Sequence, residues 1–270
     1  MQQQLSEIRM SDGTVISYTV FDGAGPAVVI LHGLAGSSRE FVPTAEALPG
    51  RRVILIDQRG HGRSTRVPAD TSRAAFVADA ARVIEAESSG PVDLVGQSMG
   101  AHTAMLVAAA HPHLIRKLVL LEGNEGGGSP EEHADLAQFF HSWQVPFATR
   151  EQAQESLGGG PLAQAWAADL EARPDGLYPR FDPDVMAQTI RHLATPRWEE
   201  WTSVLAPTLV VYADGGMFTE EQKARFVAGG ANVQRVDLLG ASHDAHLDAF
   251  DRWVDSLADF IAEGEVSLLK

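Results

Sequence analysis

Residues 92–110 read VDLVGQSMGAHTAMLVAAA and carry three structural signals in one uninterrupted run. Val92 to Gly96 is a short apolar segment of the kind that forms a parallel strand buried on both faces. The residues from Ser98 to Ala110 are rich in alanine and end shortly before Pro112, which is typical of a helix. Between the two stands Gly96-Gln97-Ser98-Met99-Gly100, a Gly-x-Ser-x-Gly turn. The run therefore predicts a strand, a tight turn and a helix in immediate succession.

Ser98 stands on the predicted turn, in the arrangement known as a nucleophile elbow. The flanking glycines allow a strained backbone conformation at the serine and let neighbouring segments approach closely. The hydroxyl group then projects at the carboxyl end of the sheet. The helix that follows directs its positive end toward negative charge that develops there. We therefore predict that Ser98 is a nucleophile.

Apolar runs and helix-like segments alternate along much of the remaining chain. Runs rich in Val, Ile and Leu predict strands at 14–20, 27–31, 52–57, 92–96, 117–122 and 208–212, with a weaker strand at 233–239. Amphipathic or capped segments predict helices at 72–88, 98–110, 219–228 and 247–262. Strands that alternate with helices form parallel βαβ units, so the pattern predicts a three-layer α/β fold.

The segment from Glu125 to Trp201 breaks this alternation. It contains the glycine runs 126–128 and 158–160, many prolines and most of the tryptophans, so it reads as short helices joined by turns. Its apolar residues need a surface to pack against. We expect residues 125–201 to form a helical cap over a core made of residues 1–124 and 202–270.

The order of four landmarks resembles the α/β-hydrolase superfamily along nearly the whole chain. They are 31–36 (LHGLAG), 57–64 (DQRGHGRS), the elbow at Ser98, and 240–243 (GASH). The resemblance implies a mostly parallel eight-stranded sheet flanked by helices, with a cap inserted after strand 6. It also implies that His243 is the general base for Ser98, with the backbone N–H groups of Leu34 and Met99 as oxyanion donors. Loss of one such donor typically costs about 2.7–4 kcal/mol.

The carboxylate that orients His243 is the point where the sequence departs from the commonest pattern of the superfamily. Its usual position, after the seventh strand, falls on Gly216 in this chain, and Asp214 lies two residues earlier. Some members carry the acid at the end of the sixth strand, which is Glu122 here. An ionisable group that closes an apolar strand is costly unless it is paired or exposed. We favour Glu122, with Asp214 and a merely solvated Glu122 as the alternatives.

Four residues are predicted to line the substrate site, namely His32, Gly33, Trp143 and His246. His32 also has a structural interpretation, because a histidine in this kind of loop commonly bonds to the backbone. His102 follows Ser98 by one helical turn and is interpreted as a packed helix histidine. Cap aromatics suggest an apolar substrate, since small-molecule sites are mostly hydrophobic.

The favoured function is a cofactor-free hydrolase that cleaves small, moderately hydrophobic carboxylic esters or lactones through an acyl-enzyme on Ser98. A serine nucleophile sets aside the dehalogenases and epoxide hydrolases of this fold, which need an aspartate. The alternatives are a C–C bond hydrolase, a cofactor-free dioxygenase and a non-hydrolytic ligand-binding receptor. C–C bond hydrolases often read Ser-x-Gly-Gly, whereas this chain has Ser98-Met99-Gly100-Ala101.

The composition narrows the partners that we expect. The 270 residues carry a net charge of −15 without a basic cluster, which disfavours nucleic acid and anionic membranes. The absence of cysteine excludes disulfides, and His111 and His113 lack a third ligand of suitable spacing, so we expect no metal. The glycines of the loops form no nucleotide-binding pattern, so we expect no cofactor. The polar start of the chain favours a cytoplasmic protein, and a homo-oligomer stays open.

Overall fold

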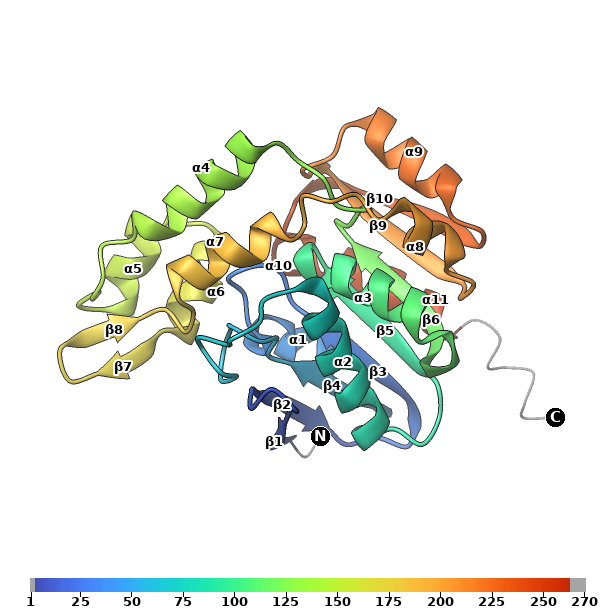
Figure 1. Ribbon diagram of the computed structural model, residues 1–270, viewed down its shortest axis with the longest axis horizontal. Coiled ribbons are helices and arrows are strands. Elements are labelled where there is room, and N and C mark those ends of the chain that lie inside the picture. Colours follow the sequence, from blue (N-terminus) through green and yellow to red (C-terminus); the bar gives the residue numbers. More distant parts are fainter. Residues whose placement is uncertain (1–2, 263–270) are drawn as a thin grey trace.

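The computed structural model describes residues 3–262, which are organised around an eight-stranded sheet with the strand order β1-β2-β4-β3-β5-β6-β9-β10 (Figure 1). The pairs β1–β2 and β2–β4 are antiparallel and all other pairs are parallel. The mostly parallel sheet is therefore confirmed. Its strands are β1 (Gln3–Arg9), β2 (Val15–Phe21), β3 (Gly25–Leu31), β4 (Arg51–Ile56), β5 (Val92–Gln97), β6 (Ile115–Leu121), β9 (Thr208–Gly215) and β10 (Val233–Ser242).

Helices cover both faces of the sheet and complete the three layers. One apolar cluster joins the sheet to α2 (Arg73–Glu87), α3 (Met99–Ala110), α8 (Trp198–Ser203) and α9 (Glu220–Gly229). A second cluster joins the other face to η1 (Ser38–Phe41), α1 (Val42–Glu46), α10 (Ala245–Asp248) and α11 (Phe250–Ala262). A short helix, η2 (Pro112–Leu114), leads into β6. Burial of the central strands on both faces explains their continuous apolar sequences.

Two elements differ from the sequence-based expectation. The edge strand β1 was not predicted, because its residues are polar and largely exposed, with Leu5 at 54% exposure. The helix predicted at 247–262 is two helices, α10 and α11, which meet at Ala249. The capping box predicted at Thr219 is present, with Gln222 as its partner.

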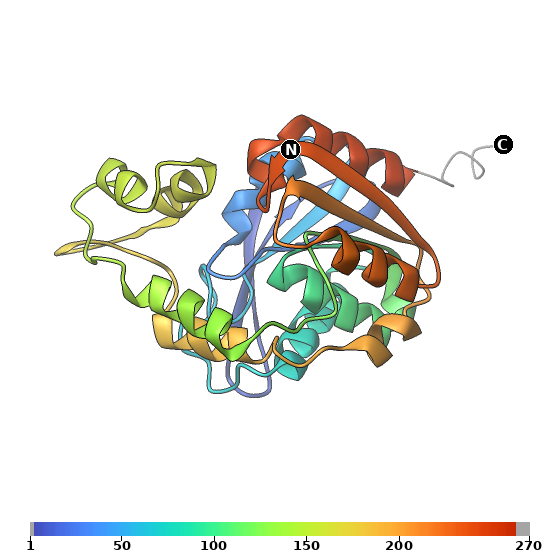
Figure 2. The ribbon, with the colours of Figure 1, turned by 90° about the horizontal axis from the view of Figure 1, so that it is seen from above.

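The chain between β6 and β9 leaves the sheet and forms a body beside it. Its elements are α4 (Pro130–His141), α5 (Arg150–Ser156), α6 (Pro161–Asp169), the hairpin β7 (Glu171–Arg173) and β8 (Gly176–Tyr178), and α7 (Pro183–Arg191). Figures 1 and 2 show these elements extending to one side of the sheet. They share an apolar cluster around Phe140, Trp143 and Phe181, which Ala35 of the loop after β3 joins from the core. We call residues 125–197 the insertion.

The return to the core comes earlier than the expected boundary at residue 201. The helix α8 packs against α3 and α9, and the ring of Trp201 stacks on Phe226 with 4.2 Å between centroids. Trp201 is completely buried, and its indole N–H donates to the carbonyl oxygen of Phe226. Trp198 packs on the same cluster. Both tryptophans therefore belong to the packing of the core.

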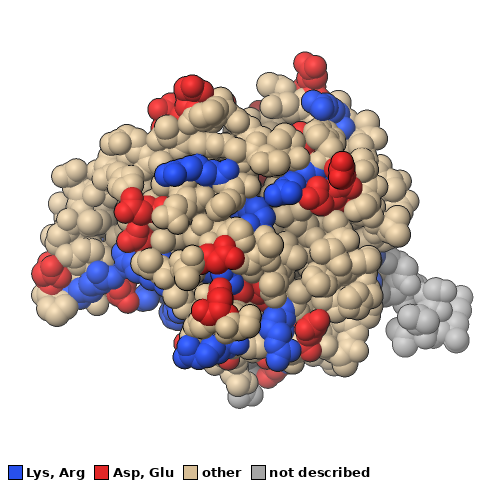
Figure 3. All heavy atoms as spheres, viewed as in Figure 1, with Lys and Arg blue, Asp and Glu red and all other residues tan. Residues whose placement is uncertain are grey.

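On the face that Figure 3 displays, acidic and basic side chains are interspersed, and there is no large basic region. Within residues 3–262 the structure contains no helix of the length and apolar character that crossing a bilayer requires.

Candidate active site

The turn between β5 and α3 holds Ser98 in a strained conformation, with φ 53° and ψ −118°. The glycines on either side of Ser98 are required because neighbouring backbone atoms lie very close to them. A Cβ atom at Gly96 would lie 2.2 Å from the carbonyl oxygen of Gly100, and one at Gly100 would lie 2.2 Å from that of Leu31. The N–H of Ser98 donates to the carbonyl oxygen of Leu121 on β6. The elbow is thus fixed by its contacts with two neighbouring strands.

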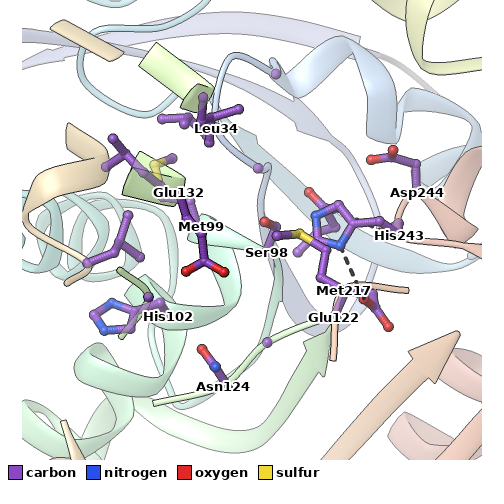
Figure 4. Close-up of a pocket in the computed structure, with 18 of the residues that line it drawn as sticks. Leu34, Ser98, Met99, His102, Glu122, Asn124, Glu132, Met217, His243 and Asp244 are labelled. Atoms are coloured by element: carbon purple, nitrogen blue, oxygen red, sulfur yellow. Dashed lines mark hydrogen bonds and ion pairs between the residues drawn. The ribbon is translucent and has the colours of Figure 1, made fainter. Parts of the chain in front are cut away.

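His243 follows β10 and lies beside Ser98, at the carboxyl ends of the parallel strands. Its Nδ1 atom is 3.1 Å from Oε2 of Glu122, the residue directly after β6. Figure 4 shows the imidazole ring between the serine and the carboxylate. An ionised carboxylate only accepts hydrogen bonds, so Nδ1 carries the proton and donates it. The lone pair of Nε2 is then available to a serine hydroxyl.

The carboxylate of Glu122 is held from two further directions. Its Oε1 accepts from the N–H of Ala213 at 2.8 Å, and its Oε2 accepts from the N–H of Met217 at 3.0 Å. The residue is 1% exposed and has φ 49°, a left-handed conformation that is uncommon outside glycine. Three donors therefore fix both oxygens of a buried carboxylate, which compensates for its burial and orients His243.

The loop after β9 leaves room for this carboxylate and supplies none of its own. A Cβ atom at Gly216 would lie 2.3 Å from both oxygens of Glu122, so a side chain there would occupy the place of the carboxylate. Asp214 is exposed, and its Oδ1 accepts from the N–H groups of Gly215 and Ala241. It therefore joins β9 to β10 and does not reach His243.

The loop after β3 approaches Ser98 from the opposite side. A Cβ atom at Gly33 would lie 2.2 Å from the side-chain oxygen of Gln97, so a larger residue would require the glutamine to move. Ala35 has φ 60°, which bends the loop and leaves the N–H of Leu34 without an acceptor among the described residues. Met99 is the first residue of α3, and its N–H has no intrahelical acceptor. Leu34 and Met99 both line the cavity with Ser98, so these two N–H groups are candidates to bind a ligand oxygen.

Ser98, His243 and Glu122 open onto a cavity of about 430 Å³ between the core and the insertion. One wall is apolar and comes mainly from the insertion, with Leu136, Phe139, Phe140, Leu162 and Trp166. The ionisable side chains in the lining of the described chain are carboxylic acids and histidines: Glu40, Glu122, Glu132, Asp244, His102, His133 and His243. The cavity is therefore apolar on one side and carries acidic rather than basic groups.

Burial shifts several of these groups toward their neutral forms. It raises the pKa of Glu40 to about 8 and also raises the pKa of Asp244. Behind the cavity, burial lowers the pKa of His246 to about 4 and that of His32 to about 4. These groups are poorly solvated, so a charged form would be disfavoured at each of them.

Comparison with known proteins supports the same conclusion about the fold. Residues 26–250 match the family described as "alpha/beta hydrolase fold". The chain belongs to this family. Among solved structures, this α/β hydrolase is similar to E-2-(acetamidomethylene)succinate hydrolase, with a TM-score of 0.86 and 23% identity over 96% of this chain and 99% of that one.

Curated relatives of the hydrolase act on different bonds. It is 38% identical to the sn-1-specific diacylglycerol lipase ABHD11 of Xenopus laevis, over 91% of this chain and 83% of the relative. It is 29% identical to 2-hydroxy-6-oxononadienedioate/2-hydroxy-6-oxononatrienedioate hydrolase of Paraburkholderia xenovorans (strain LB400), over 94% and 93%. These similarities place the chain among hydrolases. They do not identify its substrate, which must be inferred from the residues of the site.

Of the residues predicted to bind substrate, the hydrolase places Gly33 in the cavity lining and the other three elsewhere. His32 is 1% exposed; its Nδ1 donates to the carbonyl oxygen of Gly33, and its Nε2 accepts from the N–H of Gln58. Trp143 is buried in the apolar cluster of the insertion. His246 stacks on Phe41, with 4.4 Å between centroids. None of these three side chains is among the residues that line the cavity, and their role in substrate binding stays a prediction.

The lining also contains polar residues that were not predicted to bind substrate, among them His102, Asn124 and Glu132. The position of His102, one helical turn after Ser98, was a usable signal, although we interpreted it as a packing residue. Asn124 and Glu132 carry no motif; Asn124 lies two residues after Glu122 at the end of β6, and the insertion brings Glu132 to the cavity.

Proposed function

We propose that the protein is a carboxylic ester hydrolase that acts through an acyl-enzyme on Ser98. The observation that carries the proposal is the hydrogen bond from His243 to the carboxylate of Glu122, whose two oxygens both accept hydrogen bonds. This pair lies beside Ser98, which has a strained backbone. This arrangement provides a nucleophile, a base and a group that orients the base, which are the components of a hydrolytic triad. The similarity to a lipase over most of the chain agrees with it.

In the proposed reaction, Oγ of Ser98 attacks the ester carbonyl carbon while Nε2 of His243 takes the hydroxyl proton. The negative charge that forms on the carbonyl oxygen is stabilised by the N–H groups of Leu34 and Met99. The C–O bond of the ester then breaks, and His243 gives its proton to the departing alcohol. Water, deprotonated by His243, attacks the acyl-enzyme, and the carboxylic acid leaves as Ser98 regains its proton.

The charges in the cavity favour a neutral ester over the diacid substrates that some relatives are named for. A substrate with two carboxylates would approach Glu132, and no lysine or arginine is among the described residues that line the cavity to pair with either carboxylate. The C–C bond hydrolase remains the second candidate because one relative of nearly equal length carries that name.

We further propose that the insertion is a cap that shapes the substrate site. It supplies most of the apolar wall that faces Ser98. It joins the core through two adjacent segments, because the N–H of Gly127 donates to Leu193 and that of Arg197 donates to Glu125. Removal of this wall is expected to leave the triad exposed to water and to weaken selection for acyl length.

The direct test is hydrolysis of p-nitrophenyl esters of increasing acyl length by the wild type and by Ser98→Ala. We expect turnover by the wild type and a loss of about 10⁶-fold in kcat for the variant. Ser203→Ala, which alters an exposed serine on α8, is the matched control and is expected to retain full activity. Cleavage of a 1,5-diketone diacid without cleavage of any ester would favour the C–C bond hydrolase.

A further inference from the structure

Polar side chains gather on the side of Ser98 that lies away from His243. They are His102 on α3, Asn124 after β6 and Glu132 in the first turn of α4, and all three line the cavity (Figure 4). His102 is tied to the elbow, because its N–H donates to the carbonyl oxygen of Ser98 at 3.1 Å. We call these three residues the polar wall.

His102 is the member of the polar wall that needs a partner. Its side chain is 2% exposed, and among residues 3–262 neither ring nitrogen makes a hydrogen bond of normal geometry; the backbone of Glu125 is near enough to act on its pKa, which it raises. A buried polar group without a partner costs about 1–3 kcal/mol, so such groups are rare in folded proteins. An imidazole that lines a ligand cavity and makes no hydrogen bond of normal geometry within the described chain is therefore a candidate contact for the ligand.

The protonation state of His102 restricts what that ligand group can be. Burial, followed by the charges of Arg73 and Arg197, lowers the pKa of His102 well below its usual value. The ring is therefore neutral at physiological pH, with one N–H donor and one acceptor nitrogen. A hydroxyl group can complement both, whereas a carboxylate can only accept.

Asn124 and Glu132 agree with a hydroxyl ligand. The side-chain oxygen of Asn124 accepts from the N–H of Gly126 at 2.9 Å, which leaves its amide nitrogen as a donor. Oε2 of Glu132 accepts from the N–H of Ser129 at 2.7 Å, so the side chain is held in place while the carboxylate lines the cavity. The polar wall thus offers both donors and acceptors, and its negative charge opposes an anionic ligand.

The opposite wall decides which part of an ester would carry the hydroxyl groups. Leu136, Phe140 and Trp166 present apolar surface that suits an acyl chain. The part of the ester that meets the polar wall is then the alcohol. We propose, on the basis of the proposed ester hydrolysis, that the polar wall binds free hydroxyl groups on the alcohol part of the substrate. The substrate class is esters of polyols.

The test compares two esters of octanoic acid, the propyl ester and the 2,3-dihydroxypropyl ester. They share the acyl group and the length of the alcohol and differ only in the hydroxyl groups. We expect the wild type to favour the dihydroxypropyl ester by about tenfold or more in kcat/KM, because unpaired polar groups in the site penalise an analogue that lacks the hydroxyls.

Two variants locate that preference. His102→Phe keeps a planar ring without polar atoms, and Glu132→Ala removes a carboxylate from an exposed helix start; each is expected to reduce the ratio of the two kcat/KM values toward one. Glu131→Ala, which removes the neighbouring acidic residue of α4 outside the cavity lining, is expected to keep the wild-type ratio.

Equal kcat/KM for the two esters in the wild type would overturn the inference. So would an unchanged ratio in both His102→Phe and Glu132→Ala, or a stronger preference for the monoester of a diacid. If the wild type cleaves neither octanoate ester nor any p-nitrophenyl ester, the proposed function itself fails. These results are distinguishable because only the last removes ester hydrolysis altogether.

Discussion

The end of β6 and the loop after β9 are neighbouring regions, and either could supply the carboxylate that bonds to His243, but only the end of β6 does so. The family resemblance implies an acid in the loop after β9, yet that loop has Gly216 there, and Asp214, near the end of β9, bonds to the N–H of Ala241. The end of β6 supplies Glu122, whose carboxylate fills the space that a side chain at Gly216 would need. An acid after β6, as in this chain, and an acid after β9, as the resemblance implies, would both meet His243, although they come from different strands.

Strand pairing explains why the exchange is possible. The strands β6 and β9 are parallel neighbours in register from Leu118 with Thr208 to Leu121 with Val211, so they end at the same edge of the sheet. The N–H of Glu122 continues the ladder by donating to the carbonyl oxygen of Val211. The position of a carboxylate relative to the histidine therefore matters more than its position in the chain.

The largest expected effect comes from removing the charge on β6. Glu122→Gln should lower kcat by about 10⁴-fold, because the amide no longer favours the tautomer of His243 that can accept the serine proton. Steady-state kinetics with a p-nitrophenyl ester measure the loss, and circular dichroism checks that the fold is retained. A fully active Glu122→Gln would show that the acid lies elsewhere.

A smaller effect is expected from crowding the same carboxylate from the β9 side. In Gly216→Ala the added Cβ atom would lie 2.3 Å from both oxygens of Glu122, so the carboxylate must shift. A displacement on the order of 1 Å can cost about 10²-fold in rate. Kinetics on the purified variant test this, with Gly90→Ala as a structural control, because an added Cβ atom there would meet nothing within 4 Å. If Gly216→Ala matches the wild type, the two regions do not compete for one space.

A transplant sharpens the comparison further. Glu122→Ala should be nearly inactive, and adding Gly216→Asp should restore activity by about tenfold or more, because the new carboxylate enters the vacated space. Side-by-side measurement of kcat for the single and double variants gives the recovery. Identical values for the two would mean that the β9 loop cannot direct a carboxylate at His243.

The smallest effect is expected at Asp214. Asp214→Asn should leave kcat within about twofold, because the side chain faces Ala241 and not His243. Loss of two backbone hydrogen bonds in Asp214→Ala should lower the free energy of unfolding by about 0.5–1.5 kcal/mol. Urea denaturation measures this change, and a crippled Asp214→Asn would reverse our assignment of the two regions.

The sequence predicted the sheet and the elbow because both are encoded by residues close together in the chain. Runs of Val, Ile and Leu mark strands buried on both faces, and Gly96 is required by its close approach to Gly100 within the same turn. The choice between Glu122 and Asp214 as the acid could not be made from residues close together in the chain. It depends on how the ends of β6, β9 and β10 converge, which is a property of the folded sheet.

Prediction of the cavity wall was less successful for a related reason. His32, Trp143 and His246 are large polar or aromatic residues in suggestive positions, but backbone bonds and apolar packing occupy them. His102 lines the cavity, although its pattern is that of a buried helix residue. Which side chains reach the cavity is decided by the packing of the folded chain and by the path of the insertion.

The most direct test of the central claim is intact-mass analysis of the enzyme quenched during turnover of an ester, followed by peptide mapping. We expect an adduct with the mass of the acyl group on Ser98 in the wild type and no adduct in Ser98→Ala. Hydrolysis that proceeds at the wild-type rate in Ser98→Ala, or an acyl group found on another residue, would contradict the account.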